Sequence, residues 1–290
     1  MHSSMSKCAV AGAILALCSA AWAAPRLVSA GGDATYLDDA ATGDVTVLAN
    51  PAGATTATPE IVALATDPRT DAVYGIDLGD FLSSRVSLLE LDSTGHVIAS
   101  QPITYQGQPV PLAEALAFTP RGTLYVSFRL ATDAGAGTVS GHVAVLDPAT
   151  AAIDPATAIS LSGGTQNDGD ALEFIDGTLY LLDTSANIGT YLFTVDLNSG
   201  ALTKIDQIFV GGAAYQVNDV AWDGHELFAE GYAIADRADG KLLVIDPATA
   251  RGTLVGPSTS RPTMDGLTIL HHGKRCDSGD DDCGPSRRPR

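Results

Sequence analysis

Basic residues are scarce in this sequence: 16 Lys and Arg stand against 34 Asp and Glu, and the formal net charge is −18. Proteins that bind nucleic acid neutralise its phosphates with Lys and Arg, so this deficit excludes nucleic acid as a partner. An acidic surface fits solubility, cation binding, or both.

Long hydrophobic runs are absent as well. The apolar segment from Cys8 to Ala20 is too short to span a bilayer, and no later segment approaches ~20 apolar residues. Together with Lys7 and Ala21-Trp22-Ala23, this segment has the pattern of a secretory signal, which predicts a signal peptide over residues 1–23. We therefore expect a secreted or periplasmic protein without a membrane span.

Cysteine is rare, with four in the chain. Cys8 and Cys18 lie in the predicted signal peptide, which leaves Cys276 and Cys283 near the C-terminus. In an oxidising compartment these two can form a disulfide that closes a short loop. The loop is too short to staple a core, so we expect a local clasp within a C-terminal tail of residues 273–290.

The sequence contains no H-E-x-x-H, G-x-S-x-G, Walker or C-x-x-C motif, so no reaction follows from a motif. Apolar patterns with a helical period are also lacking beyond the signal. Frequent Thr and Val, 30 Gly, and Asp-Pro and Asp-Gly pairs instead favour many short strands joined by turns.

One sequence motif occurs twice in closely similar form, as VAVLDPATA (143–151) and as LLVIDPATA (242–250). Its aspartate recurs at intervals of 53, 55, 49 and 50 residues, as Asp39, Asp92, Asp147, Asp196 and Asp246. An Asp side chain accepts hydrogen bonds from backbone N–H groups two residues on, which favours a hairpin turn. We therefore expect these five aspartates to be turn residues, with Gly43, Gly95 and Gly200 in the left-handed conformation.

A repeat of about 50 residues with three or four strands per unit is typical of a β-propeller. The N-terminal segment matches the later strands of a unit, and MDGLTIL (264–270) matches a first strand. The sequence thus predicts an all-β fold, a monomeric five-bladed β-propeller over residues 24–272, closed by N- and C-terminal strands that share one blade.

Polar residues occupy one aligned position at the start of the predicted innermost strands: Glu114, Asp170, Asn218 and Asp265. The remaining unit has Val62 there, with Glu60 two residues earlier on the same face. Since innermost strands begin at one mouth of the central channel, these side chains should converge. Asn167, Asp168 and Asp219 are weaker candidates for supporting contacts.

Three carboxylates and an amide oxygen that converge suit Ca²⁺, and without a cation or a shared proton the carboxylates would repel one another. We therefore expect a Ca²⁺ site at Glu114, Asp170, Asn218 and Asp265. The alternative is that these residues only cap their strands and hydrate the channel.

The phrases EALAFTPRGTLYVSF, DALEFIDGTLYLLD and MDGLTIL resemble the blades of secreted gluconolactonase-like and NHL-type propellers. The resemblance implies a divalent cation held by Glu114, Asn218 and Asp265, with Asp170 as a further ligand or base. That group typically has six blades, whereas five are expected here, and Val62 departs from its ligand pattern.

Three functions remain open. The first is binding of a small-molecule ligand or cation at the channel mouth without chemistry, which we prefer because no base and nucleophile are defined. The second is a Ca²⁺-dependent hydrolase of the lactonase or esterase type, with Asp170 or Glu114 as base. The third is a glycosidase that uses two channel carboxylates.

Overall fold

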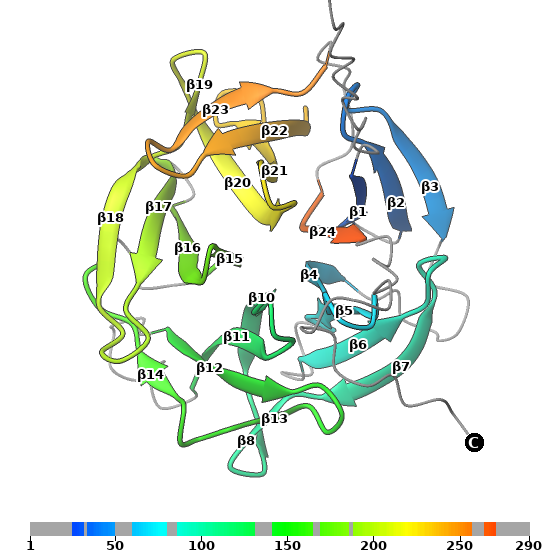
Figure 1. The fold of residues 1–290 in the computed structure, drawn as a ribbon, viewed down its shortest axis with the longest axis vertical. Helices are drawn as coiled ribbons and strands as arrows, with labels where there is room; N and C mark the ends of the chain where they lie inside the picture. The colour runs from blue at the N-terminus through cyan, green and yellow to red at the C-terminus, as the bar shows by residue number, and fades with distance from the viewer. Residues whose placement is uncertain are drawn as a thin grey trace, which may run out of the picture.

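The structure is a computed structural model that describes residues 25–31, 34–49, 60–79, 86–130, 141–164, 169–185, 188–256 and 264–270. Regular structure in these residues is all β-strand, in five sheets that lie around a common centre (Figure 1). This is the arrangement of a β-propeller, and the all-β prediction is confirmed. No helix in the described part of the chain has the length and hydrophobicity needed to cross a membrane.

Three sheets have four strands each, ordered from the centre outward. The first consists of β4 (Ile61–Thr66), β5 (Val73–Asp77), β6 (Ser87–Leu91) and β7 (Val97–Pro102). The second consists of β15 (Ala171–Ile175), β16 (Thr178–Ser185), β17 (Gly189–Val195) and β18 (Leu202–Gln207). The third consists of β24 (Gly266–Leu270), β1 (Arg26–Gly31), β2 (Ala34–Asp39) and β3 (Val45–Ala49).

The other two sheets are more elaborate than the meander that the sequence predicts. One contains β10 (Leu112–Phe118), β11 (Leu124–Arg129), β12 (His142–Asp147), β13 (Ala152–Ile153) and β14 (Ile159–Ser160), with a hairpin of β8 (Thr104–Tyr105) and β9 (Gln108–Pro109). The last contains β19 (Phe209–Val210), β20 (Ala213–Trp222), β21 (Leu227–Ala233), β22 (Lys241–Asp246) and β23 (Arg251–Leu254).

Parallel pairing causes this elaboration. Strand β19 pairs antiparallel with β20 and parallel with β23, so the last sheet closes on itself as a five-stranded barrel. In the other sheet, β8 pairs parallel with β13 in the same way. In both cases the segment that leads into the innermost strand returns across the outer strand of its own sheet and satisfies backbone groups there.

The repeated aspartates form the predicted turns. In all five, Oδ1 accepts a hydrogen bond from the N–H two residues on, at Ala41, Thr94, Ala149, Asn198 and Ala248, over 2.8–2.9 Å. Gly43, Gly95 and Gly200 have φ of 74°, 84° and 74°, which confirms the left-handed position. Ala151 and Ala250 take that conformation in the other two turns, with φ of 51° and 55°.

Each interface between neighbouring sheets is filled by its own hydrophobic cluster, so the ring is packed all the way round. Aromatic residues on the second strand of one sheet meet those on the innermost strand of the next. Tyr74 lies 5.7 Å from Phe118 between ring centroids, and Tyr125 lies 5.2 Å from Phe174. Such pairs add about 0.5–1.5 kcal/mol each to the burial of their area.

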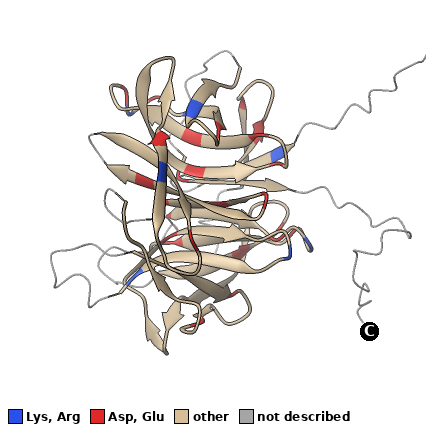
Figure 2. Cartoon of the chain, turned by 60° about the vertical axis from the view of Figure 1, so that its left-hand side comes forward, with Lys and Arg blue, Asp and Glu red and all other residues tan. Residues whose placement is uncertain are grey.

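The two ends of the described chain share one sheet, because β24 pairs antiparallel with β1 from Leu270↔Arg26 to Gly266↔Ala30. This pairing agrees with the prediction from the complementary terminal segments. Acidic side chains are spread over strands and turns and outnumber the basic ones (Figure 2). The predictions for residues 1–23, for the tail of residues 273–290 and for the Cys276–Cys283 pair lie outside the described residues.

Candidate functional site

Three innermost strands carry a β-bulge close to their start. The strand register shifts between Ile61 and Ala63 in β4, between Ala113 and Ala115 in β10, and between Val217 and Asp219 in β20. The skipped residues have no partner directly opposite, and a bulge turns such a side chain out of the regular alternation. They are Val62, Glu114 and Asn218.

The other two innermost strands begin directly after the aligned residue. The N–H of Asp170 donates to the carbonyl of Leu182 over 3.0 Å, and the N–H of Asp265 donates to the carbonyl of Ala30 over 2.8 Å. Both aspartates are thus anchored by their backbone to the second strand of their sheet, and both line the cavity described next.

All five aligned residues line one cavity of about 200 Å³. We term this cavity the acidic mouth. Its lining consists of Glu60, Val62, Leu78, Glu114, Asp170, Thr184, Gln216, Val217, Asn218 and Asp265. The structure therefore brings together Glu114, Asp170, Asn218 and Asp265, as the sequence predicts, and it adds Glu60 and the neighbouring amide and hydroxyl groups.

The carboxylates of the acidic mouth fall into two pairs. The innermost strands contact one another in the cyclic order β4, β10, β15, β20, β24. Glu60 and Asp265 precede the neighbouring strands β4 and β24, and the Glu60 charge acts on the pKa of Asp265. Glu114 lies in β10 and Asp170 precedes the neighbouring strand β15, and the Glu114 charge acts on the pKa of Asp170. Asn218 lies between Asp170 and Asp265 on the ring, so it separates the pairs on one side.

Hydrogen bonds and one ion pair fix parts of the rim. Asn218 donates from Nδ2 to the Met264 carbonyl over 2.7 Å and to Asp265 Oδ1 over 3.1 Å. Arg129 Nη2 lies 3.4 Å from Glu114 Oε2, in a partly exposed ion pair. One of the four carboxylates thus has a basic partner, and the mouth keeps a net negative charge when its carboxylates are ionised.

Burial raises the pKa values of Asp170, Asp265 and Glu114. Burial, with help from Glu114, raises the pKa of Asp170 to about 7. Burial and the Glu60 charge raise the pKa of Asp265 to about 6. Burial also raises the pKa of Glu114, against the opposing effect of Arg129. Among the described residues, no positive side chain opposes the shifts of Asp170 and Asp265, and a bound cation would stabilise the ionised forms of both.

The predicted Ca²⁺ ligands do not converge on one point. Among the described residues, no three His, Cys, Asp or Glu side chains lie close enough together to hold one metal ion. Ca²⁺ takes six to eight oxygen ligands at 2.3–2.6 Å, so direct coordination by all the predicted carboxylates does not fit this arrangement. The gathering of the residues is observed, and their role as metal ligands stays a prediction.

Asp219 does not contact the acidic mouth as the sequence suggests. Its side chain is 1% exposed, and Oδ2 accepts hydrogen bonds from the N–H groups of Leu64 over 3.1 Å and Leu267 over 2.8 Å. Oδ1 accepts from Val220 N–H over 2.9 Å. Asp219 therefore satisfies the inner edges of β4 and β24, which have no further strand to pair with. Asn167 and Asp168 lie outside the described residues.

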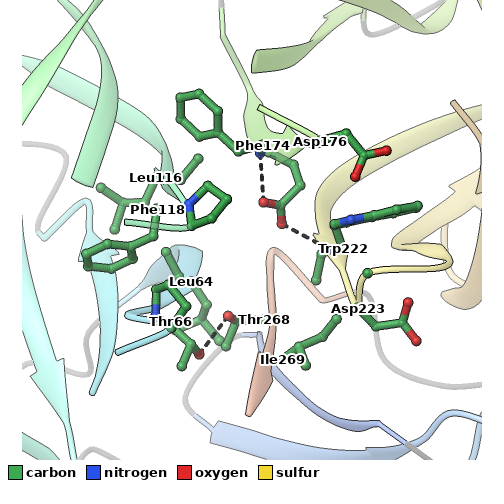
Figure 3. A pocket seen from close by; sticks show the side chains of 17 residues that line it. Leu64, Thr66, Leu116, Phe118, Phe174, Asp176, Trp222, Asp223, Thr268 and Ile269 are labelled. Carbon is green, nitrogen blue, oxygen red and sulfur yellow. Dashed lines mark hydrogen bonds between the residues drawn. The ribbon is translucent and has the colours of Figure 1, made fainter. Parts of the chain in front are cut away.

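Sequence reasoning missed Glu173, which does the same for the inner edges of β15 and β20. Its carboxylate accepts hydrogen bonds from Phe174 N–H over 2.8 Å and Trp222 N–H over 3.0 Å (Figure 3). Glu173 was overlooked because the repeat has no acidic residue at this step in the other units. The sequence signal that could have identified Glu173 is an acidic residue directly before Phe174, the aromatic residue of a predicted innermost strand.

No protein-family model matches the chain. No curated protein matches it either. Solved structures do resemble it. A protein of unknown function from Bacteroides caccae has a TM-score of 0.51 at 9% identity, over 86% of this chain and 99% of that chain.

Two further likenesses are weaker. A putative TolB from Agrobacterium tumefaciens has a TM-score of 0.49 at 14% identity, over 83% of this chain and 80% of that chain. A GH43 glycoside hydrolase with an engineered active site has a TM-score of 0.46 at 14% identity, over 87% of this chain and 56% of that chain. These likenesses carry no functional argument, and the Bacteroides structure shows similarity of fold alone.

Proposed function

We propose that this chain is a five-bladed β-propeller that binds a small cation at the acidic mouth without catalysing a reaction. The single observation that supports the proposal is the gathering of four carboxylates, from four different sheets, in one cavity of about 200 Å³. A structural role alone gives no reason for four blades to place an acid at the same mouth, since burial there disfavours the ionised forms of Glu114, Asp170 and Asp265.

The packing supports the proposed number of blades. Five sheets, each with an innermost strand in contact with the next, and five hydrophobic clusters between them support a ring of five. In this proposal, the barrel-like closure by β19 and the β8–β9 hairpin are additions to two blades and do not alter the count.

Ca²⁺ is the first cation to test. The two carboxylate pairs and the amide oxygen of Asn218 provide hard oxygen ligands on both sides of the cavity. Because no three acidic groups meet at one point, the pairs would contact the ion partly through its water molecules. A small organic cation would be attracted by the same charges.

Thermal melting at pH 8 tests this proposal. Addition of CaCl₂ after EDTA treatment should raise the melting temperature. At a free Ca²⁺ concentration a hundred times the dissociation constant, binding should stabilise the folded state by about 2.7 kcal/mol. NaCl at matched ionic strength is the control for screening. Asp265→Asn should reduce the Ca²⁺ effect, and Asp176→Asn, an exposed acid outside the mouth, should retain it. A shift no larger than that with NaCl would contradict cation binding.

Asp170 favours a second candidate function, hydrolysis of a lactone or ester. A general base works best with a pKa near the working pH, and the pKa of Asp170 is about 7. This function predicts turnover of a lactone or aryl ester that rises with pH through this pKa and is lost in Asp170→Asn. Turnover that survives both chelation and this substitution would remove it.

We also propose that the protein acts in the periplasm or outside the cell. The support is the Ala21-Trp22-Ala23 step after a short apolar run. Mass spectrometry of the protein from the periplasmic or culture fraction should find a chain that begins at Ala24. A full-length N-terminus in those fractions would contradict cleavage.

A further inference from the structure

A second cavity lies at the opposite ends of the innermost strands from the acidic mouth (Figure 3). It has a volume of about 270 Å³. Its walls are mostly apolar, and side chains of all five innermost strands form them: Leu64, Leu116, Phe118, Phe174, Trp222 and Ile269. We term it the apolar mouth.

The carboxylate of Glu173 and a pair of threonine hydroxyls interrupt the apolar wall. The carboxylate of Glu173 is held in place by the N–H groups of Phe174 and Trp222, and Glu173 belongs to the lining of the cavity. Opposite it, the hydroxyls of Thr66 and Thr268 share a hydrogen bond of 2.9 Å, and both side chains are buried. The polar atoms of this mouth are therefore fixed before any ligand arrives.

The charge of the apolar mouth has one sign. Glu173, Asp176 and Asp223 belong to its lining, and the described residues of this lining include no Lys, Arg or His. Burial, with a contribution from the Glu173 charge, raises the pKa of the nearby Asp219 carboxyl well above its ordinary value. Burial raises the pKa of Glu173 to about 8, because two backbone N–H groups do not replace a counter-charge. A ligand with a positive group would supply the missing charge.

The aromatic rings of this mouth belong to the packing between sheets. Phe118 packs on Tyr74, and Phe174 packs edge-on against Tyr125. Figure 3 shows both phenylalanine rings directed away from the centre, so they do not form a cage of ring faces. Selectivity in this cavity therefore depends on its apolar walls and on its carboxylates, of which Glu173 is held in place by backbone N–H groups.

We propose that the apolar mouth binds a small hydrophobic primary ammonium compound, whose charged nitrogen contacts Glu173 and whose apolar body contacts Leu64, Leu116 and Ile269. The volume lies just below the usual range of ligand pockets, about 300–1,000 Å³, which limits the body to the size of a single ring or a short alkyl chain. The site is separate from the acidic mouth and independent of its occupant.

Trp222 gives a local readout, because the chain has two tryptophans and the other is Trp22. The full chain with Trp22→Phe is titrated with benzylamine at pH 7, and the emission of Trp222 is followed. Benzyl alcohol is the neutral match and benzoate the anionic match. We expect a saturable change with benzylamine, a midpoint at least tenfold higher for benzyl alcohol, and no change with benzoate.

Glu173→Gln tests the partner of the charge, since it retains one oxygen acceptor for the backbone and removes the carboxylate. Its midpoint for benzylamine should rise at least tenfold, whereas Glu226→Gln, an exposed acid outside the cavity, should leave the midpoint unchanged. Equal midpoints for benzylamine and benzyl alcohol, or an unchanged midpoint in Glu173→Gln, would overturn the proposal. If Glu173→Gln fails to fold, the series of three ligands on the parent chain decides by itself.

Discussion

Replacing Asp170 by Asn is expected to make the protein more stable, and by a larger amount at pH 8 than at pH 5. Asp170 lies in the acidic mouth, where burial and the neighbouring Glu114 raise its pKa from 3.8 to about 7. Asn has nearly the same shape and keeps an oxygen that can accept the N–H of Thr184, but it carries no charge. The substitution therefore isolates the cost of ionising Asp170 in the folded state.

The direction follows from proton binding. Between pH 3.8 and about 7, the folded protein holds a proton on Asp170 that the unfolded chain has released. Stability contributed by this proton is greatest at acid pH, falls as the pH rises through this range, and is gone above pH 7. At pH 5, most Asp170 side chains in the folded state are neutral, as Asn is, whereas at pH 8 they are ionised.

The magnitude follows from the part of the shift that titrates in the experiment. About two pKa units lie between pH 5 and the folded pKa of about 7. At about 1.4 kcal/mol per unit, the variant should gain about 2 to 3 kcal/mol over the parent chain on going from pH 5 to pH 8. Addition of Ca²⁺ should reduce this gain, because a bound cation stabilises the ionised form.

Urea unfolding in EDTA at pH 5, 6.5 and 8, followed by circular dichroism, measures the free energy of unfolding of both chains. Asp176→Asn is the matched control, since it removes the same formal charge from an exposed position where φ is 49° and Asn is tolerated. A stability difference between Asp170→Asn and the parent chain that is the same at pH 5 and pH 8 would refute the reasoning.

Three further predictions concern the scaffold and are all measured by urea unfolding. Asp219→Ala should cost about 3–5 kcal/mol, because it leaves three buried backbone N–H groups without an acceptor, and Asp219→Asn should cost less; equal losses would argue against this role. Asp246→Ala should cost about 1 kcal/mol through loss of the turn hydrogen bonds, and no change would mean that Pro247 alone fixes the turn. Gly200→Ala should cost more than Gly177→Ala, although both glycines have positive φ, because a Cβ at Gly200 would meet the carbonyl of Ser160. Gly177 faces open space, so Gly177→Ala should cost only the strain of the left-handed conformation, about 1–2 kcal/mol. The reverse order of the two losses would contradict the close approach at Gly200.

Local chemistry explains which parts of the fold were predictable. The hairpin at Asp246 depends on an Asp side chain and an N–H two residues away, so the sequence contains everything that the turn requires. The strands around it follow from apolar alternation. The extra pairing of β19 with β23 was not predictable, because two-residue strands leave no periodic pattern and a parallel partner lies far along the chain.

The acidic mouth was predictable in membership and not in geometry. The repeat identifies Glu114, Asp170, Asn218 and Asp265, because they stand at one aligned position of the repeat and equivalent residues take equivalent places in the ring. The division into pairs depends on which blades are neighbours and on where the bulges fall. The spacing of residues along the sequence specifies neither property.

By itself, the sequence determined the five hairpin turns, the all-β class and the aligned acids, since hydrogen bonds between near neighbours and a regular repeat specify them. The tertiary structure alone decided that Asp219 and Glu173 satisfy the inner strand edges and that a second cavity opens beside Glu173. The physical reason is that an unpaired backbone N–H at a ring's centre exists only once the ring has closed, and its acceptor can come from another sheet.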